Sequence, residues 1–407
     1  MNEGVAAEKA NGADVVGVWG RSLGLACLLI LTGLWLGEHG FPHGPTWATG
    51  NFFRRASYWD GGWYLSVAEH GYHWNGNPHI QQNVAFFPLY PLIERLFHGF
   101  GLSWGAAAIV PSLVCAAVLP PPFYALAGQV DKGAPRRFAT MALMIYPGAQ
   151  FYIGGYPTSL MNLIVILALW GTLSRRYWIA AAIAGIGTAV GPLMVFLSAT
   201  VWGAYVSHRV QQGLDGRLAA FVGRTVALGI LALSGLLLYM AFLWLRFRDP
   251  LAFMQVQHAW GSVPFGVRVY RFFTLAGVFG GGYTKFLLSL LPLGAAQPLR
   301  VFEGSLENTL NTVTFVILAA SVWWARKTLP RVTVLYATLA LVGYLWFMGS
   351  VQGPMSTVRL LFITIPAFMA MGQLAEKHRR TAVGLTAFFG GALVLQTALF
   401  AAGYWVV

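Results

Sequence analysis

The sequence predicts an all-α polytopic membrane protein with about eleven transmembrane helices. Of its 407 residues, 57% are hydrophobic and only 10% are charged, and the mean hydropathy is +0.62. Soluble domains carry roughly 25% charged residues. Apolar runs recur along the whole chain, and a helix needs about 20 such residues to cross a bilayer. Residues 1–20 are polar, and no cleavable signal peptide follows, so the first run is predicted to be a retained helix.

The predicted spans follow one another with short connections. The run 178–207 is broken by Gly191-Pro192, and proline interrupts a helix, so we interpret it as a tight hairpin of two short helices. The spans are predicted near 22–37, 104–127, 137–153, 158–174, 178–190, 191–207, 222–245, 306–325, 332–349, 359–375 and 381–404.

Short basic loops set the predicted orientation. The positive-inside rule places such loops in the cytoplasm. Residues 1–20 then form a disordered cytoplasmic tail, and 21–407 form a single transmembrane domain of the cell membrane. Its two long outer loops are 38–103 and 246–305, and 272–293 is expected to be interfacial or re-entrant. The basic loops are DKGAPRR (131–137), SRR (174–176), SHR (207–209), ARK (325–327) and KHRR (377–380).

The composition argues against several other classes. The net charge of +13 is spread over many loops and forms no single basic face, which argues against nucleic-acid binding. Cys27 and Cys115 fall inside apolar runs, so a disulfide is not expected. The histidines at 70, 73 and 79 lie near Glu69, but their spacing matches no defined metal site. We expect neither a metal nor a cofactor.

The first outer loop is too long and too aromatic for a simple linker. It contains RRASYWDGGWYLSVAEHGY (54–72) and FFPLYPLIERLF (86–97), and both segments are amphipathic. Loops of this length in compact proteins are usually functional. Tryptophan and tyrosine suit the headgroup depth of a bilayer, so we expect two short helices along the outer membrane surface.

Asp60, in the stretch WDGGWY, has two interpretations. Ser57-x-x-Asp60 fits a capping box for a helix beginning near Tyr58. Alternatively, Asp60 is a general base: among Trp59, Trp63 and Tyr64 it would be partly desolvated, which makes a carboxylate more basic. In that case Gly61 and Gly62 leave room for a ligand.

Other candidates lie on the same predicted side of the membrane. Arg54, Arg55 and Arg95 flank the first outer loop and could hold a phosphate, although surface arginines also bind solvent or lipid headgroups. Arg359 opens a predicted span at its outer end, where it either snorkels or binds an anion. In the second outer loop, Asp249 has the position of a helix cap. The expected substrate contacts are Trp59, Trp63, Tyr64, Tyr90, His258 and Trp260.

The order of these motifs resembles the PIG-V-like family, the relatives of GPI mannosyltransferase II. The similarity covers most of 45–375 and depends chiefly on WDGGWY and FFPLYP, followed by RDPLAFMQVQHAWG (248–261) and by Arg359 before LLFITIPAF. Membership would imply a GT-C-like glycosyltransferase fold with an outward-facing active site. It would also imply an inverting transfer of mannose from a polyprenyl-phosphate donor to a lipid-linked or glycan acceptor. Asp60 would be the base and Arg359 a ligand of the donor phosphate.

The chain departs from the family pattern at two positions. Relatives carry an acidic residue after the third span, where this chain reads GGYPTSL (154–160). Relatives also carry Arg-Pro in the next hairpin, where this chain has Gly191-Pro192. Two alternatives therefore stay open: a catalytically degenerate protein that binds a lipid-linked glycan, and a lipid or glycan transporter. Transporters often show repeats and mid-span charges, and neither is visible here.

Overall fold

The structure is a computed structural model that describes residues 2–44, 55–131, 133–213, 218–261, 263–275, 298–348 and 356–404. Every regular element within these ranges is a helix. The all-α prediction is confirmed for this part of the chain. Residues 276–297, which hold most of the segment expected to be interfacial or re-entrant, lie outside the described residues.

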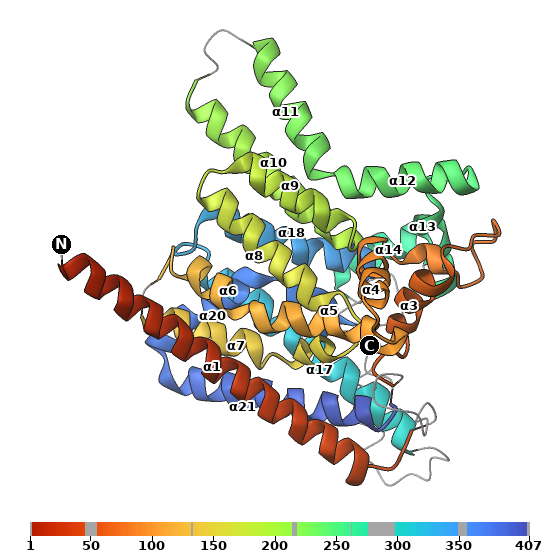
Figure 1. The fold of residues 1–407 in the computed structure, drawn as a ribbon, viewed down its shortest axis with the longest axis horizontal. Coiled ribbons are helices and arrows are strands. Elements are labelled where there is room, and N and C mark those ends of the chain that lie inside the picture. Colours follow the sequence, from red (N-terminus) through yellow and green to blue (C-terminus); the bar gives the residue numbers. More distant parts are fainter. Residues whose placement is uncertain are drawn as a thin grey trace.

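The N-terminal half of the chain forms a long first helix, the helices of the predicted first outer loop and a packed group of apolar helices. Figure 1 shows the long helix running beside the last helix of the chain, and the two are in contact along their length. The elements are α1 (Asn2–His39), α3 (Asp60–His70), η1 (Asn83–Ala85), α4 (Leu89–Gly99), α5 (Trp104–Val118), α6 (Pro120–Ala127), α7 (Ala134–Met144), η2 (Pro147–Ile153), α8 (Thr158–Leu173), α9 (Tyr177–Thr188), η3 (Pro192–Met194) and α10 (Val195–Gln211).

The C-terminal half completes the bundle. The helix at 365–377 packs between the helix at 134–144 and the long helix at 298–325, which closes the core. The elements are α11 (Leu218–Ala232), α12 (Ser234–Phe247), α13 (Ala252–Gln255), η4 (Val256–Trp260), α14 (Phe265–Thr274), α17 (Pro298–Ala325), α18 (Arg331–Met348), α19 (Thr357–Leu360), η5 (Leu361–Ile363), α20 (Ile365–Lys377) and α21 (Arg379–Ala401).

The predicted spans coincide with helices, but several of these helices are broken. Among the described residues, three helices are long and apolar enough to cross a membrane, or up to six if each bent pair counts as one span. The segment predicted as 222–245 is two helices that meet at 67°, and 359–375 bends by 87°. The second bend precedes Pro366, which cannot continue a helical hydrogen-bond ladder. The count of eleven spans stays a prediction.

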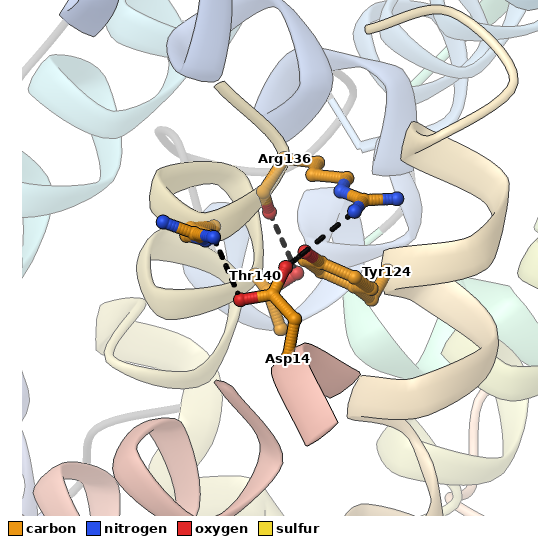
Figure 2. Close-up of polar contacts among 5 residues, drawn as sticks. Asp14, Tyr124, Arg136 and Thr140 are labelled. Atoms are coloured by element: carbon orange, nitrogen blue, oxygen red, sulfur yellow. Dashed lines mark hydrogen bonds and ion pairs between the residues drawn. The ribbon is translucent and has the colours of Figure 1, made fainter. Parts of the chain in front are cut away.

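The N-terminal segment is helical where the sequence suggested disorder. Asp14 of α1 accepts hydrogen bonds from the Tyr124 hydroxyl of α6 and from two arginines of α7 (Figure 2). Its carboxylate lies 2.8 Å from Arg137 Nη2 and 3.4 Å from Arg136 Nη2. A hydrogen bond from Thr140 to the carbonyl of Arg136 completes the cluster. The expectation of a disordered tail is therefore wrong for the stretch around Asp14, which is fixed to the bundle.

The two long predicted outer loops meet at one end of the molecule. Figure 1 shows α3 and α4 together with α13 and α14 at this end. The predicted pair of short helices in the first outer loop is confirmed as α3 and α4. On α4, Tyr90 and Glu94 face inward, whereas Leu92, Leu96 and Phe100 are exposed.

Candidate functional site

Asp60 and Arg359, which the sequence singled out separately, form an ion pair. The Arg359 Nη2 atom lies 2.6 Å from Asp60 Oδ2, which is the distance of a charge-assisted hydrogen bond. The Arg359 side chain is 13% exposed and that of Asp60 is 25% exposed. The pair is therefore partly shielded from solvent but still accessible to it.

The backbone just before Asp60 is strained. Helix α3 begins at Asp60 itself, with Trp59 as its N-cap at φ 54° and ψ −123°. Residues with a side chain rarely adopt such angles, and holding them costs of order 1–3 kcal/mol. The predicted capping box is wrong, because Trp59 rather than Ser57 caps the helix and its side chain makes no cap hydrogen bond. Asp60 instead directs its carboxylate to Arg359.

Gly61 allows α3 to approach the turn that contains Gly155 and Tyr156. A Cβ at Gly61 would lie 3.1 Å from the carbonyl oxygen of Gly155, which is closer than most real contacts. The Gly155 amide donates to the Ala56 carbonyl, and the Tyr156 hydroxyl donates to the Tyr58 carbonyl. The expectation that Gly61 leaves room for a ligand is wrong, because backbone occupies that space. The contact instead fixes the start of α3.

Arg359 lies on the one-turn helix α19, beside two aromatic rings that contact each other. Its guanidinium carbon is 5.4 Å from the ring centre of Tyr156 and 5.7 Å from that of Phe151. Ser356, just before α19, has φ 54°, and the Val358 amide donates to Asn311 Oδ1 at 3.0 Å. The Arg359 Nε atom is buried and has no hydrogen-bond partner among the described residues. One N–H of Arg359 is thus buried without a partner, in addition to the group that bonds Asp60.

Aromatic side chains from both predicted outer loops cluster beside the pair. The Trp63 ring stacks on Phe86 at 5.9 Å, and Trp260 meets both rings edge-on at 6.1 and 6.0 Å. Tyr64 contacts Phe86 and Tyr90 edge-on. The structure therefore brings Trp63, Tyr64 and Trp260 together, and their role as substrate contacts stays a prediction.

The other predicted site residues make contacts outside the aromatic cluster. Tyr90 is fully buried and its hydroxyl donates to the Ala108 carbonyl, so it packs beneath the site. Trp59 packs on Phe400, and the exposed His258 lies near the His79 ring. Arg55 forms an ion pair with Glu38 of α1. The prediction for Arg54 lies outside the described residues.

The two departures from the family pattern both fall at structural contacts. Thr158 and Ser159 lie in the first turn of α8 and are buried, and Ser159 donates to the Ser112 carbonyl. The start of α4 contacts the hairpin just before Gly191-Pro192, because the Leu89 amide donates a hydrogen bond to the Ala189 carbonyl. Neither segment places a carboxylate or a guanidinium beside Asp60.

Glu94 is a buried acid that the sequence reasoning did not single out. Its side chain is 0% exposed, and neither carboxylate oxygen has a hydrogen-bond partner among the described residues. Burial raises the pKa of the Glu94 carboxyl well above its ordinary value, and the nearby Glu69 carboxylate adds to the rise. The available signal was its spacing: Glu94 follows Tyr90 by four residues, on the inward face of α4.

Comparisons with known proteins leave the family open. No family model matches the chain, and no curated protein matches it. Solved structures of the Archaeoglobus fulgidus oligosaccharyltransferase are similar, one in complex with Zn and sulfate (TM-score 0.44, 12% identity, 93% of this chain and 53% of that chain). Its apo form gives TM-score 0.45 at 11% identity, covering 95% and 56% of the two chains.

A third structure is the same archaeal enzyme, AglB, in complex with an inhibitory peptide and a dolichol-phosphate. It gives TM-score 0.38 at 12% identity and covers 94% of this chain and 56% of that one. The chain thus spans about half the length of the solved proteins that it matches. A likeness at this level identifies neither the family nor the activity.

Proposed function

We propose that the protein is a membrane glycosyltransferase of GT-C type, acting on the outer face. It transfers mannose from a polyprenyl-phosphate donor to a lipid-linked or glycan acceptor, with inversion at the anomeric carbon. Asp60 is the general base and Arg359 binds the donor phosphate. The observation that carries the proposal is the contact between Asp60 and Arg359, because this reaction needs a base and a cation in one partly shielded place.

The ion pair describes the enzyme without its donor. A carboxylate held by a guanidinium is a poor base, since the positive charge favours its ionised form. In an inverting transfer the base and the leaving group lie on opposite faces of the sugar. The sugar must therefore enter between Asp60 and Arg359. The donor phosphate then replaces the carboxylate as the partner of Arg359, and Asp60 is released to act on the acceptor.

The proposed transfer is a single displacement at the anomeric carbon. The acceptor hydroxyl oxygen attacks the anomeric carbon while its proton moves to Asp60. The bond from that carbon to the phosphate oxygen breaks, and the polyprenyl phosphate leaves with the electron pair. Arg359 stabilises the negative charge that develops on this oxygen, and oriented charges of this kind provide much of the barrier lowering in enzymes.

The aromatic cluster supports a sugar substrate. The ring centres of Trp63 and Trp260 are 6.1 Å apart, beside the Asp60–Arg359 pair. The two residues come from the two predicted outer loops. Flat apolar rings of this kind can pack against the carbon-bound hydrogens of a sugar ring. A donor bound at Arg359 would then place its sugar near these rings.

A second candidate is a catalytically degenerate protein that binds a lipid-linked glycan through the same residues. It is favoured by the neutral Thr158 and Ser159, which stand where relatives carry an acidic residue. Such a protein would bind the donor at Arg359 without transferring the sugar. The two candidates therefore differ in turnover and not in donor binding.

The test is transfer of labelled mannose from a polyprenyl-phosphate donor by the purified protein and by Asp60→Asn. Asparagine has nearly the same shape as aspartate, so the variant should fold and bind donor while transfer falls roughly 10²–10⁴-fold, the usual worth of a general base. A thermal-unfolding midpoint equal to that of the wild type controls for folding. Full transfer by folded Asp60→Asn would refute the proposal, and donor binding without any wild-type transfer would favour the degenerate protein.

A further inference from the structure

A cavity of about 550 Å³ lies away from the ion pair, between α3, α4 and α12. Its lining begins on α3 at Val67, seven residues after Asp60, which corresponds to about 10 Å along the helix. The walls are mostly apolar and include Leu92 of α4 together with Leu238 and Phe242 of α12. The mechanism above uses none of these residues.

Two arginines give this apolar cavity a positive rim. Arg95 of α4 and Arg246 of α12 both line it and are both exposed. The lining residues include no carboxylate. His70, the third basic group, is 3.7 Å from the carboxylate of its neighbour Glu69. The cavity therefore presents net positive charge beside an apolar surface.

Each of the two long walls repeats the same pattern along its helix. On α12, Leu238, Phe242 and Arg246 are four residues apart and so share one face. Pro88, the N-cap of α4, shares a face with Leu92 and Arg95 of that helix, at spacings of four and three residues. Both helices therefore present apolar side chains first and an arginine near the C-terminal end. This order complements an amphiphile with an apolar chain and an anionic head.

The length and surroundings of the cavity fit a membrane lipid. From Gly235 to Arg246 the α12 wall measures about 16 Å, close to the roughly 15 Å of hydrocarbon in one leaflet. Figure 1 shows α12 running toward the end where α3, α4 and α13 gather. Leu92, Leu238 and Phe242 are 58%, 70% and 42% exposed, as expected for side chains that face lipid tails.

We propose that this cavity binds one anionic phospholipid of the outer leaflet. One acyl chain lies between α4 and α12, and the phosphate contacts Arg95 and Arg246. The separation of this lipid from the sugar donor rests on the proposed function, in which the donor phosphate binds Arg359. The same phosphate cannot reach the cavity arginines as well, because the cavity begins about two helical turns further along α3. The lipid is therefore separate from the sugar donor.

The test measures lipid binding directly, so that its outcome does not depend on transferase activity. The full-length protein is reconstituted in nanodiscs that contain phosphatidylglycerol or phosphatidylcholine carrying a photoreactive group on the acyl chain. We expect phosphatidylglycerol to cross-link to α4 and α12 in preference to phosphatidylcholine. The variant Arg95→Gln/Arg246→Gln should lose this preference by about fivefold per arginine, the equivalent of ~1 kcal/mol each.

Two further variants separate the cavity from general lipid contact. Arg248→Gln is the matched control, because Arg248 is an exposed arginine at the end of α12 that does not line the cavity, and it should cross-link like the wild type. Leu238→Trp fills the cavity from an exposed position and should reduce cross-linking with either headgroup. Equal labelling by the two lipids, or unchanged labelling in the double variant, would overturn the proposal. So would stronger competition by polyprenyl phosphate than by phosphatidylglycerol.

Discussion

Two aspartates, one toward each end of the bundle, are paired with arginine, but their surroundings differ. Asp14 accepts from Tyr124, Arg136 and Arg137, and all four residues lie within regular helices. Asp60 forms an ion pair with one arginine, Arg359.

The backbone conformation near the two ion pairs also differs. Trp59 and Ser356, which have positive φ angles, precede Asp60 and Arg359 closely in the chain. Backbone strain is a cost that a purely structural pair has no reason to carry. The comparison fits an Asp14 cluster that holds helices together and, under the function proposed above, an Asp60 pair that exchanges partners.

The largest effect that sharpens this comparison is expected at Arg359. Arg359→Lys keeps the charge but loses the planar fork that binds a phosphate through two hydrogen bonds. We expect transfer to fall roughly 10²-fold or more, as when a charge-stabilising donor is removed from other active sites. Steady-state kinetics at varied donor concentration measure the change. Arg137→Lys, at the Asp14 cluster, is the matched control and should keep wild-type kinetics. Unchanged kinetics in folded Arg359→Ala would exclude Arg359 from the site.

A smaller effect is expected from the close packing beneath Asp60. Gly61→Ala places a Cβ 3.1 Å from the Gly155 carbonyl oxygen, so α3 must shift by a few tenths of an ångström. Because catalysis depends on position, we expect transfer to fall about tenfold with donor affinity nearly unchanged. Gly76→Ala tests glycine replacement in the same predicted outer loop, at a position with no neighbouring atom within 4 Å but with a positive φ. Wild-type transfer in Gly61→Ala would show that this contact does not position Asp60.

The sequence predicted the separate parts of the site better than their arrangement. Asp60 was singled out by the scarcity of charged residues and by its aromatic neighbours. Arg359 was singled out by its position at the start of a predicted span. Their contact joins distant segments, and nothing in local periodicity reports such a contact. Local patterns also misassigned Ser57 as a cap, because packing of the Gly155–Tyr156 turn decides where α3 begins. The aromatic cluster was predictable in its members but not in its pairing.

Helix existence was also easier to predict than helix continuity. Hydropathy found the stretch 222–245, but the bend near Leu233 depends on how α11 and α12 pack, and an apolar run carries no signal for it. The bend before Pro366 did have a signal in the proline itself. Glu94 was missed because an acid in an amphipathic helix is usually solvated, and only the packing of α4 against other helices, α3 and α5 among them, buries it.

Glu94 provides a pH-dependent test of stability whose sign is opposite to that expected for Asp14. Its pKa is raised in the folded state by burial and by Glu69, so the native protein holds a proton that the unfolded chain releases. Stability is therefore full below the ordinary glutamate pKa and falls as pH rises toward the folded-state value. Glu94→Gln removes this loss. We expect its unfolding midpoint to rise relative to wild type between pH 5 and pH 8.

Thermal unfolding at several pH values in the same detergent makes this comparison. Glu376→Gln, which changes an exposed glutamate in the same way, is the control and should leave the pH profile unchanged. A Glu94→Gln profile parallel to that of the wild type would show that Glu94 is ionised in the folded protein. The ionised Glu94 carboxylate would then need a hydrogen-bond or ionic partner in the membrane-embedded protein.

The smallest effect is expected at Asp14, and it completes the comparison. A hydrogen bond from Tyr124 lowers the pKa of the Asp14 carboxyl, and Arg136 and Arg137 act in the same direction against partial burial. The stabilisation is present above the ordinary aspartate pKa and is lost as pH falls through the lowered value. Because Asp14 is 22% exposed and solvent weakens such pairs, Asp14→Asn should cost only ~1 kcal/mol of stability. Its transfer rate should stay within about twofold of wild type, whereas Asp60→Asn loses transfer and keeps stability. A folded Asp14→Asn protein with transfer as low as that of Asp60→Asn would show that the cluster near the N-terminus controls the reaction. The distinction between a structural role for Asp14 and a catalytic role for Asp60 would then be wrong.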